Sequence, residues 1–388
     1  MESRNMKYYI IAGEASGDLH GANLMKGLTR HDPDCEIRFW GGEKMAAVGG
    51  TMVRDYRENA VMGIVEVISR LGSIMKNLEF CKQDICAYNP DAVILIDYPG
   101  FNLKIAKFAH ERGYKVFYYI PPKVWARGEK RIKLLKKYVD QVFIIFPFET
   151  EYFRSRGIDA IYNGNPLTDN ILSSPSVKSD MNSFLASHGI KGAEGKQIIA
   201  LLAGSRKMEV NYLLPRMLKT KELLEKMEPG RYMFLLAAAP SIDDSLYMKY
   251  IGDSDIRIIR NDTYGVLAHS RTAIISSGTA SLEAAIIGIP QVVCYGLNPI
   301  SFAIGKMIVK LDTVSLANMI LGKHIFRELL QYDCTPENIA AETVRMDRDA
   351  DYRQAMLDDY AAMMEKLSGQ GAAERTAMDI ERIIGERK

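Results

Sequence analysis

Residues 7–20 read KYYIIAGEASGDLH, an apolar run that ends in a glycine-containing turn and leads into a helical pattern. Lys7–Ala12 has the composition of a buried strand, and a helix is expected from about Leu19. The same order returns along the chain. Further strand-like runs occupy residues 36–40, 92–96, 115–120 and 141–145, and a second series occupies residues 197–202, 232–237, 256–259, 272–275 and 291–294. This alternation predicts parallel strands joined by crossover helices.

A change of composition separates the two series. Residues 171–196 are rich in serine and glycine, as expected for an interdomain boundary. We therefore expect an N-terminal Rossmann-like domain at residues 1–175, a C-terminal one at residues 176–340, and C-terminal helices at residues 341–388. The predicted fold class is α/β, with two doubly wound parallel-sheet domains and a helical C-terminal segment.

The overall composition is that of an ordinary globular protein. The 388 residues carry 50 Lys and Arg against 48 Asp and Glu, a net charge of +2, and 47 % of them are hydrophobic. This balance argues against a disordered chain or a highly charged tail protein. Because no apolar run reaches the ~18 residues that span a bilayer and residues 1–13 lack a signal pattern, a cytoplasmic protein is expected. The five scattered cysteines predict reduced thiols and no structural metal.

Several common motifs of nucleotide and hydrolase chemistry are missing from the sequence. There is no G-x-G-x-x-G after a strand, no P-loop and no G-x-S-x-G nucleophile elbow. The Asp-x-Asp pairs do not end an apolar strand. These observations argue against a dinucleotide cofactor, a P-loop NTPase and a metal-dependent sugar transferase.

Two turns of the first half follow predicted strands, where ligands bind in open α/β sheets. Residues 13–18 (GEASGD) offer small side chains and a helix N-terminus to an anionic group, or Asp18 simply caps the helix. Asp97 ends the strand at residues 92–96, where burial would raise its pKa and suit a general base, or it only caps the next turn. The candidate acceptor- or phosphate-binding residues are Glu14, Ser16, Gly17 and Asp18.

Two turns of the second half suit a nucleotide diphosphate. Residues 204–206 (GSR) combine a flexible glycine, a hydroxyl, helix N–H groups and a guanidinium just before a helix near Glu209. Residues 276–283 (SSGTASLE) form a small-residue turn before a helix, in which Glu283 could bind two ribose hydroxyls. The alternatives are a surface turn with a solvated arginine, and helix capping. The candidate donor-binding residues of these turns are Gly204, Ser205, Arg206, Ser277, Gly278, Thr279 and Glu283.

Two further segments suggest a surface role. Residues 61–80 carry apolar side chains at helical spacing, which indicates either a core-facing helix or an exposed patch for acyl chains or a membrane. The candidate membrane-facing residues are Val65, Ile68, Leu71 and Met75. Residues 123–137 hold seven Lys or Arg and one Glu, a local charge of +6 that suits phosphates or an anionic bilayer, or a solvated helix face. One basic helix in a neutral chain is weak evidence for nucleic acid, and none is expected as a partner.

The motifs, taken in order, resemble the lipid-A-disaccharide synthases from end to end. The matching segments are GEASGD, AVMGIVEV, LIDYPGFN, PPKVWARGEKR, FPFE, LAGSRKMEV, SSGTASLEA and VSLANMILG. The resemblance implies the GT-B architecture of two facing Rossmann-like domains. It also implies an inverting, metal-independent transfer of 2,3-diacylglucosamine from UDP-2,3-diacylglucosamine to the 6-hydroxyl of 2,3-diacylglucosamine 1-phosphate. The products would be UDP and the β-1,6-linked lipid A disaccharide 1-phosphate.

The resemblance also implies roles for single residues. Asp97 would be the catalytic carboxylate, with general base as the role that fits it best. Arg206 would hold the diphosphate, Glu283 the ribose, and Asn318 matches a polar position near the donor. No cofactor is implied. The family further implies a cytoplasmic enzyme at the surface of the inner membrane, and a homodimer that exchanges its C-terminal segments.

Three departures from the family pattern concern substrate detail. Gly100 stands where many members have Asp, which leaves Asp97 as the sole candidate carboxylate there. The segment after Trp125 lacks a second Trp, and Asn165 stands where members often have His. Two alternatives stay open: a UDP-N-acetylglucosamine 2-epimerase-like enzyme, and a non-catalytic protein that binds nucleotide sugars or lipids.

Overall fold

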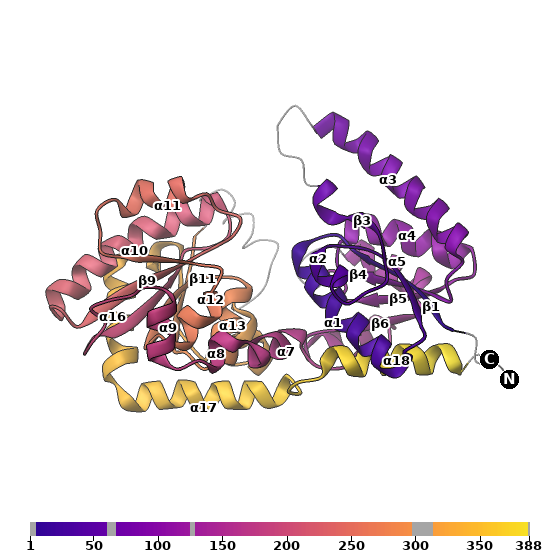
Figure 1. Cartoon of the computed structure of the whole chain (residues 1–388). Helices are drawn as coiled ribbons and strands as arrows, with labels where there is room; N and C mark the ends of the chain where they lie inside the picture. Colours follow the sequence, from indigo (N-terminus) through magenta and orange to yellow (C-terminus); the bar gives the residue numbers. More distant parts are fainter. Residues whose placement is uncertain (1–4, 60–66, 125–128, 297–312, 387–388) are drawn as a thin grey trace. The chain divides into compact units, whose positions relative to one another are not determined.

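The structure is a computed structural model, and it describes residues 5–59, 67–124, 129–296 and 313–386 (Figure 1). It divides into two compact units, one comprising Met1–Pro166 with Ser368–Lys388 and the other comprising Leu167–Leu367. The chain thus passes from the first unit to the second after Pro166, before the boundary expected at residue 175. The Ser-rich stretch forms short helices at the start of the second unit. These are α7 (Pro166–Ser173), α8 (Pro175–Lys178) and α9 (Met181–Ser187).

The described part of the first unit contains a sheet of seven parallel strands in the order β3-β2-β1-β4-β5-β6-β7. The order reverses between β1 and β4, which makes their carboxyl ends the topological switch point of this unit. The strands are β1 (Lys7–Ala12), β2 (Glu36–Gly41), β3 (Thr51–Asp55), β4 (Ala92–Ile96), β5 (Lys115–Tyr119), β6 (Gln141–Ile144) and β7 (Ala160–Tyr162).

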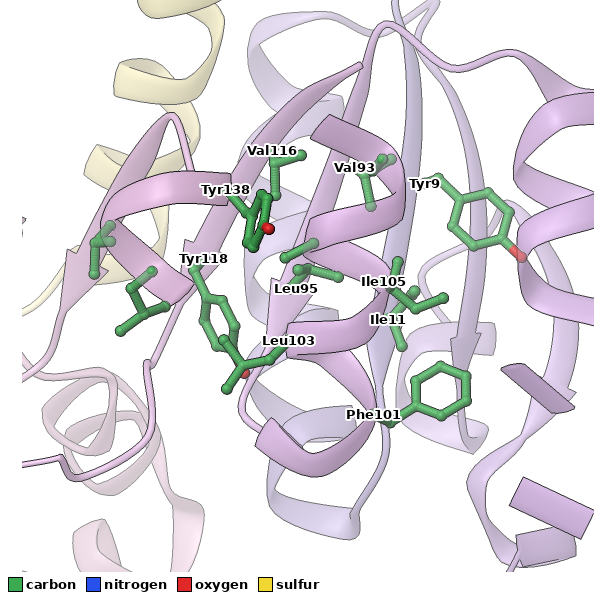
Figure 2. Packing of buried hydrophobic residues seen from close by; sticks show 14 of the residues in the cluster. Tyr9, Ile11, Val93, Leu95, Phe101, Leu103, Ile105, Val116, Tyr118 and Tyr138 are labelled. Atoms are coloured by element: carbon green, nitrogen blue, oxygen red, sulfur yellow. The ribbon is translucent and has the colours of Figure 1, made fainter. Parts of the chain in front are cut away.

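Both faces of this sheet are buried, which explains why its central strands are almost wholly apolar. Alternate residues of β1 belong to different clusters: Tyr9 and Ile11 pack on one face, Tyr8 and Ile10 on the other. Figure 2 shows the first cluster, to which β4, β5 and three of the longer helices contribute, together with Phe153 of α6 (Glu149–Arg154). Those helices are α3 (Val67–Tyr88), α4 (Pro99–Glu111) and α5 (Glu129–Tyr138).

The C-terminal helix α18 (Ala372–Gly385) lies beside α1 (Ala15–His31) in the first unit (Figure 1). Its Ala377 and Ile380 are buried in the cluster that contains Leu24 and Leu28 of α1. The two helices approach closely at Gly27, where a Cβ would lie 2.9 Å from the Cβ of Ala377. Within this single chain, the last helix therefore returns to the N-terminal unit.

The described part of the second unit contains six parallel strands in the order β10-β9-β8-β11-β12-β13. They are β8 (Gln197–Leu202), β9 (Tyr232–Ala238), β10 (Arg257–Arg260), β11 (Thr272–Ser276), β12 (Gln291–Tyr295) and β13 (Glu328–Leu330). The sheet again reverses its order, here between β8 and β11. The longer helices of this unit are α10 (Lys207–Met227), α11 (Asp244–Ile251), α13 (Thr279–Ile287), α16 (Pro336–Arg348) and α17 (Ala350–Lys366).

Asp347 fixes the end of α16 to the second sheet. Its carboxylate is 1 % exposed and accepts hydrogen bonds from Arg231, at 2.7 Å, and from Arg271, at 3.0 Å. The hydroxyl of Tyr232 donates to the same group at 3.0 Å. The helix is therefore held by a buried ion pair network as well as by apolar packing. Across the described ranges, every helix is too short or too polar to cross a bilayer.

Candidate functional site

The four motifs expected to carry chemistry lie in pairs at the two switch points. In the first unit, residues 13–18 follow β1 and Asp97 follows β4. In the second unit, residues 204–206 follow β8 and residues 277–283 follow β11. Since ligands of doubly wound sheets bind at this point, each unit offers one candidate site built from two adjacent loops.

The backbone at the first switch point is strained. Asp97 and Tyr98 both adopt the left-handed region, with φ of 46° and 47°, and Ile120 at the end of β5 has φ of 61°. Such conformations of non-glycine residues cost about 1–3 kcal/mol each and persist where the surroundings enforce them. Their grouping at the ends of two neighbouring strands marks this edge of the sheet as a candidate site.

Two side chains hold the backbone of Asp97. The Nδ2 group of Asn102 and the hydroxyl of Tyr118 donate to the main-chain carbonyl of Asp97, at 2.9 and 2.7 Å. Asn102 is completely buried and also donates to the carbonyl of Ile96 at 3.1 Å. Sequence reasoning gave Asn102 no role, although an Asn in the first turn after a strand end could have signalled it.

The carboxyl of Asp97 has the electrostatic character expected of a base. Burial raises its pKa, whereas Lys123 and the backbone N–H of Tyr98 act in the opposite direction. The expected increase of this pKa is confirmed. Burial and the charge of Asp97 also raise the pKa of Glu14. Glu14 therefore supplies a second carboxyl near Asp97, so the presence of Gly100 does not leave Asp97 alone.

The first glycine turn leads directly into α1, which begins at Ala15 rather than near Leu19. The first helical bond runs from the N–H of Asp18 to the carbonyl of Glu14 at 2.9 Å, so the N–H groups of residues 15–17 precede the helical ladder. Gly17 lets the helix approach β1, since a Cβ there would lie 3.2 Å from the Cβ of Ala12. Anion binding at Ser16 and Gly17 stays a prediction.

The ring of Tyr98 leaves no room for a side chain at Gly13. A Cβ at Gly13 would lie 2.3 Å from two ring carbons of Tyr98, so no larger residue fits without movement of that ring. Tyr98 in turn stacks on Phe101, with 5.4 Å between the ring centroids. The two loops of the first switch point are thus packed directly against each other.

Asp18 has a different task from the one expected. Its side chain is 3 % exposed, and its carboxylate accepts from the backbone N–H groups of Gly42, at 2.7 Å, and of Lys44 and Met45, both at 3.1 Å. It therefore caps the short helix α2 (Glu43–Ala46) rather than its own helix. Both of its oxygens accept hydrogen bonds from backbone N–H groups, and a role of Asp18 in acceptor or phosphate binding stays a prediction.

The loop after β8 is already occupied by a carboxylate. Glu209 Oε2 accepts from the N–H groups of Ser205 and Arg206, at 3.0 and 3.3 Å, and its Oε1 contacts Arg206 Nη1 at 3.1 Å. Gly204 has φ of 107°, which favours glycine. Two N–H groups just before the helix thus bind Glu209 in this structure, while the Arg206 side chain remains 80 % exposed.

The loop after β11 positions Glu283 on α13. Gly278 and Thr279 are exposed at the start of this helix, and Ser277 lies just before them. Burial raises the pKa of Glu283, and the hydroxyl of Tyr264, on α12 (Thr263–Ala268), donates to it at 3.5 Å. Tyr264 was not recognised from the sequence, because it lies on another helix.

Asn318 is buried and makes two side-chain hydrogen bonds within the second unit. Its Nδ2 donates to Glu328 Oε1 at 2.9 Å, and its Oδ1 accepts from the N–H of Ile325 at 2.8 Å. Glu328 also accepts from the N–H groups of Val314 and Ser315, both at 3.0 Å. These bonds anchor α15 (Leu316–Leu321) to β13. Asn318 thus helps to hold the VSLANMILG segment, and its expected place near the donor stays a prediction.

Comparison with known proteins identifies the family. The family model for lipid-A-disaccharide synthetase matches residues 8–381. The chain belongs to this family. A relative from Syntrophus aciditrophicus, named lipid-A-disaccharide synthase, is 38 % identical over 375 residues, 95 % of each chain. As a member of the lipid-A-disaccharide synthetase family, the protein is a glycosyltransferase of lipid A disaccharide synthesis.

Solved structures show the same fold at low sequence identity. A putative UDP-N-acetylglucosamine 2-epimerase from Listeria monocytogenes aligns with a TM-score of 0.69 and 15 % identity, covering 99 % of this chain and 98 % of that one. CalG4, the calicheamicin glycosyltransferase, aligns with a TM-score of 0.59 and 14 % identity, covering 99 % of both chains. The lipid-A-disaccharide synthetase chain therefore has the GT-B fold, and the predicted fold class is confirmed.

The expected membrane-facing residues of this synthetase chain lie only partly in the described structure. Val65 and the side chains of Ile68 and Leu71 lie outside the described residues. Met75 is 56 % exposed, whereas Leu78 of the same stripe is buried in the core. The described part of residues 61–80 therefore has both a side that faces the core and an exposed apolar side, as in the two alternatives that the sequence left open.

Proposed function

We propose that the protein transfers a 2,3-diacylglucosaminyl group from UDP-2,3-diacylglucosamine to the 6-hydroxyl of 2,3-diacylglucosamine 1-phosphate, with inversion at the anomeric carbon. The products are the β-1,6-linked lipid A disaccharide 1-phosphate and UDP. The observation that carries this proposal is the match to the lipid-A-disaccharide synthetase family over residues 8–381. The structural neighbours alone would fit an epimerase equally well, because they share only the fold.

Asp97 is the general base of the proposed reaction. An inverting transfer needs one group that accepts the proton of the acceptor hydroxyl as the oxygen attacks the anomeric carbon. The position of Asp97 after β4 and its raised pKa support this role, since a carboxylate whose pKa is raised accepts a proton more readily. Asn102 and Tyr118 donate hydrogen bonds to its main-chain carbonyl. These bonds fix the backbone and so restrict the orientation of the carboxylate.

The second unit binds the UDP donor in this proposal. Arg206 supplies a charge-assisted hydrogen bond to the diphosphate and stabilises the charge that develops on the leaving group. Ser205, Gly204 and the residues Ser277, Gly278 and Thr279 approach the phosphates and the nucleoside. Glu283 accepts the two ribose hydroxyls. Glu209 must then release the N–H groups of Ser205 and Arg206, because a phosphate and a carboxylate would compete for them.

The remaining expectations concern the protein's surroundings. We infer that it works at the surface of the inner membrane, where its diacylated substrates reside. The exposure of Met75 and Ile74 on α3 supports this inference. An exchanged homodimer would require α18 of one copy to take the place on α1 that this chain's own α18 occupies. Light scattering on the purified protein would distinguish monomer from dimer.

The decisive experiment supplies both proposed substrates to purified protein and identifies the product by mass spectrometry, with UDP release measured in parallel. We expect one disaccharide phosphate per UDP, with a β linkage by NMR. Asp97→Asn should lower the rate about 10²–10⁴-fold, the usual effect of removing a general base. Asp253→Asn, an exposed residue of the second unit, is the matched control. Conversion of UDP-N-acetylglucosamine to its 2-epimer, without disaccharide, would support the epimerase instead.

A further inference from the structure

An open groove of about 480 Å³ lies on the outer surface of the first unit, between α3, α4 and α5. Its volume is in the range of sites that bind small organic molecules, about 300–1,000 Å³. Figure 1 shows α3 and α4 next to each other, and α5 packs against α4. Nothing in the transfer reaction described above uses this groove.

The floor of the groove is apolar. Leu78 of α3 and Leu103 of α4 close it from below and are buried in the core. Phe108 of α4 is half-buried, and Leu134 of α5 forms the opposite wall with 38 % of its surface exposed. An exposed leucine beside an apolar floor is unfavourable in water, and the binding of a hydrocarbon chain would bury this apolar surface favourably.

The rim of the groove is cationic. Lys82, Lys104 and Lys107 line it, against a single carboxylate from Glu111. Lys107 pairs with Glu111 at 3.8 Å and Lys82 pairs with Glu79 at 3.5 Å, whereas Lys104 makes no ion pair within the described ranges. The positive charge continues along the exposed side of α5, through Lys130, Arg131, Lys133, Lys136 and Lys137.

The combination of floor and rim defines the chemistry of the ligand. A soluble anion would be attracted by the lysines but gains nothing from the floor, and a neutral lipid would fill the floor without using the lysines. We propose that this groove binds one anionic phospholipid, with an acyl chain along Leu78, Leu103 and Leu134 and the headgroup phosphate among Lys82, Lys104 and Lys107. Each cation near an anionic lipid headgroup adds to the attraction.

The groove is separate from the candidate active site. Asp97 precedes the N-terminus of α4 at Pro99, and the groove begins one turn further along this helix at Leu103 and extends over about two more turns to Glu111. The lipid site therefore acts as an attachment point for the membrane rather than as part of the catalytic machinery. It does not depend on which sugar the enzyme transfers.

The first test uses a short-chain lipid that stays monomeric. Dioctanoylphosphatidylglycerol is titrated into the full-length protein by calorimetry, with dioctanoylphosphatidylcholine and glycerol 3-phosphate as comparison ligands. We expect one site per chain, and binding at least tenfold weaker for either comparison ligand. Equal binding of the choline lipid would overturn the role of the lysines, and equal binding of glycerol 3-phosphate would overturn the role of the floor. Absence of any lipid binding would refute the site as a whole.

Variants then locate the site. Lys104→Gln with Lys107→Gln should weaken the binding of the glycerol lipid at least tenfold, and Leu134→Gln, which leaves the charge unchanged, at least threefold. Lys226→Gln, an exposed lysine of α10, is the matched control and should have no effect. Unchanged affinity in the groove variants, or an equal loss in the control, would contradict the proposal.

Activity measurements keep this proposal apart from the proposed function. The double lysine variant should retain the transfer rate with detergent-dispersed substrates. It should lose binding to vesicles that contain about 30 % phosphatidylglycerol, which gives them an anionic surface. Loss of transfer together with intact lipid binding would identify the groove as a substrate site and overturn the proposal. Failure of transfer in the wild-type protein would contradict only the function.

Discussion

The side-chain amide of Asn102 donates a hydrogen bond of 2.9 Å to the main-chain carbonyl of Asp97, the residue proposed as the general base. Asn102 lies in the first part of α4 and Asp97 follows β4, so the helix start and the strand end are tied together. This hydrogen bond holds the backbone of Asp97 in the left-handed region, with φ of 46°. Asn102 therefore acts as a positioning residue.

Asn102→Ala should lower kcat by about 10²-fold, because a misplacement of a reacting group by about 1 Å costs on this order. The Kd for UDP should stay unchanged, since the donor loops lie in the other unit. Steady-state kinetics and calorimetry measure both quantities on the same sample. Tyr118→Phe, which removes the second bond to the carbonyl of Asp97, should act in the same direction. A variant with normal kcat and only a lower melting temperature would show a purely structural role.

Lys123→Met should move the acidic limb of the pH–rate profile to higher pH. Asp97 must be ionised to act as a base, so activity is lost as the pH falls through its pKa. Lys123 favours the ionised form and holds this pKa down against the effect of burial. Without the lysine the pKa of Asp97 rises further. The profile of kcat/KM measures the limb, and Lys226→Met, in the second unit, should leave it in place.

Glu209→Gln should strengthen the binding of UDP. The Glu209 carboxylate occupies the N–H groups of Ser205 and Arg206, and a neutral amide competes less with a phosphate for them. The same change should cost on the order of 1 kcal/mol of stability, because a helix cap is weakened. Arg206→Ala is the opposite case and should weaken UDP binding at least about tenfold, as expected for the loss of a charged hydrogen bond. Weaker binding in Glu209→Gln would show that Glu209 supports the phosphate site.

Asp347→Ala should lower the free energy of unfolding of the second unit by about 3 kcal/mol at neutral pH, the low end for a broken buried ion pair. The low end applies because Arg231 and Arg271 are partly exposed. Urea denaturation measures this quantity, and Asp253→Ala, at an exposed position, should be close to neutral.

The effect of Asp347→Ala should shrink in acid. Burial alone would raise the pKa of Asp347, but the hydrogen bonds from Arg231 and Arg271 outweigh it and the pKa is lowered. A carboxylate with a lowered folded-state pKa stabilises the fold above its unfolded pKa and loses this contribution as the pH falls through the folded value. A difference between wild type and variant that stays constant down to acidic pH would contradict the network.

The central strands could be predicted from the sequence because burial on both faces makes them continuous apolar runs. The strands β3, β7 and β13 were missed, and each of them lies at an edge of its sheet. Edge strands bury less surface, so their composition carries a weaker signal. Asp97 was recognisable for the converse reason, as a charged residue that ends a fully apolar strand.

The contacts of the site could not be predicted in the same way, because many of them join different elements of the fold. The carboxylate of Asp18 caps a helix that begins 25 positions later, and the Asn318 side chain on α15 donates a hydrogen bond to Glu328 on β13. The motif suggested either a ligand role or helix capping for Asp18, and the family resemblance suggested a place near the donor for Asn318. A motif identifies a loop at a switch point, but only the packing decides which polar groups of that loop are already engaged.

The return of α18 to the first unit determines how the protein can be divided. A fragment that ends at Pro166 would lack the helix that covers Leu24 and Leu28, and would present that apolar surface to solvent. The second unit, by contrast, is one continuous stretch, Leu167–Leu367. The second unit can therefore be excised by two cuts, whereas the first unit has to be rejoined from both ends of the chain.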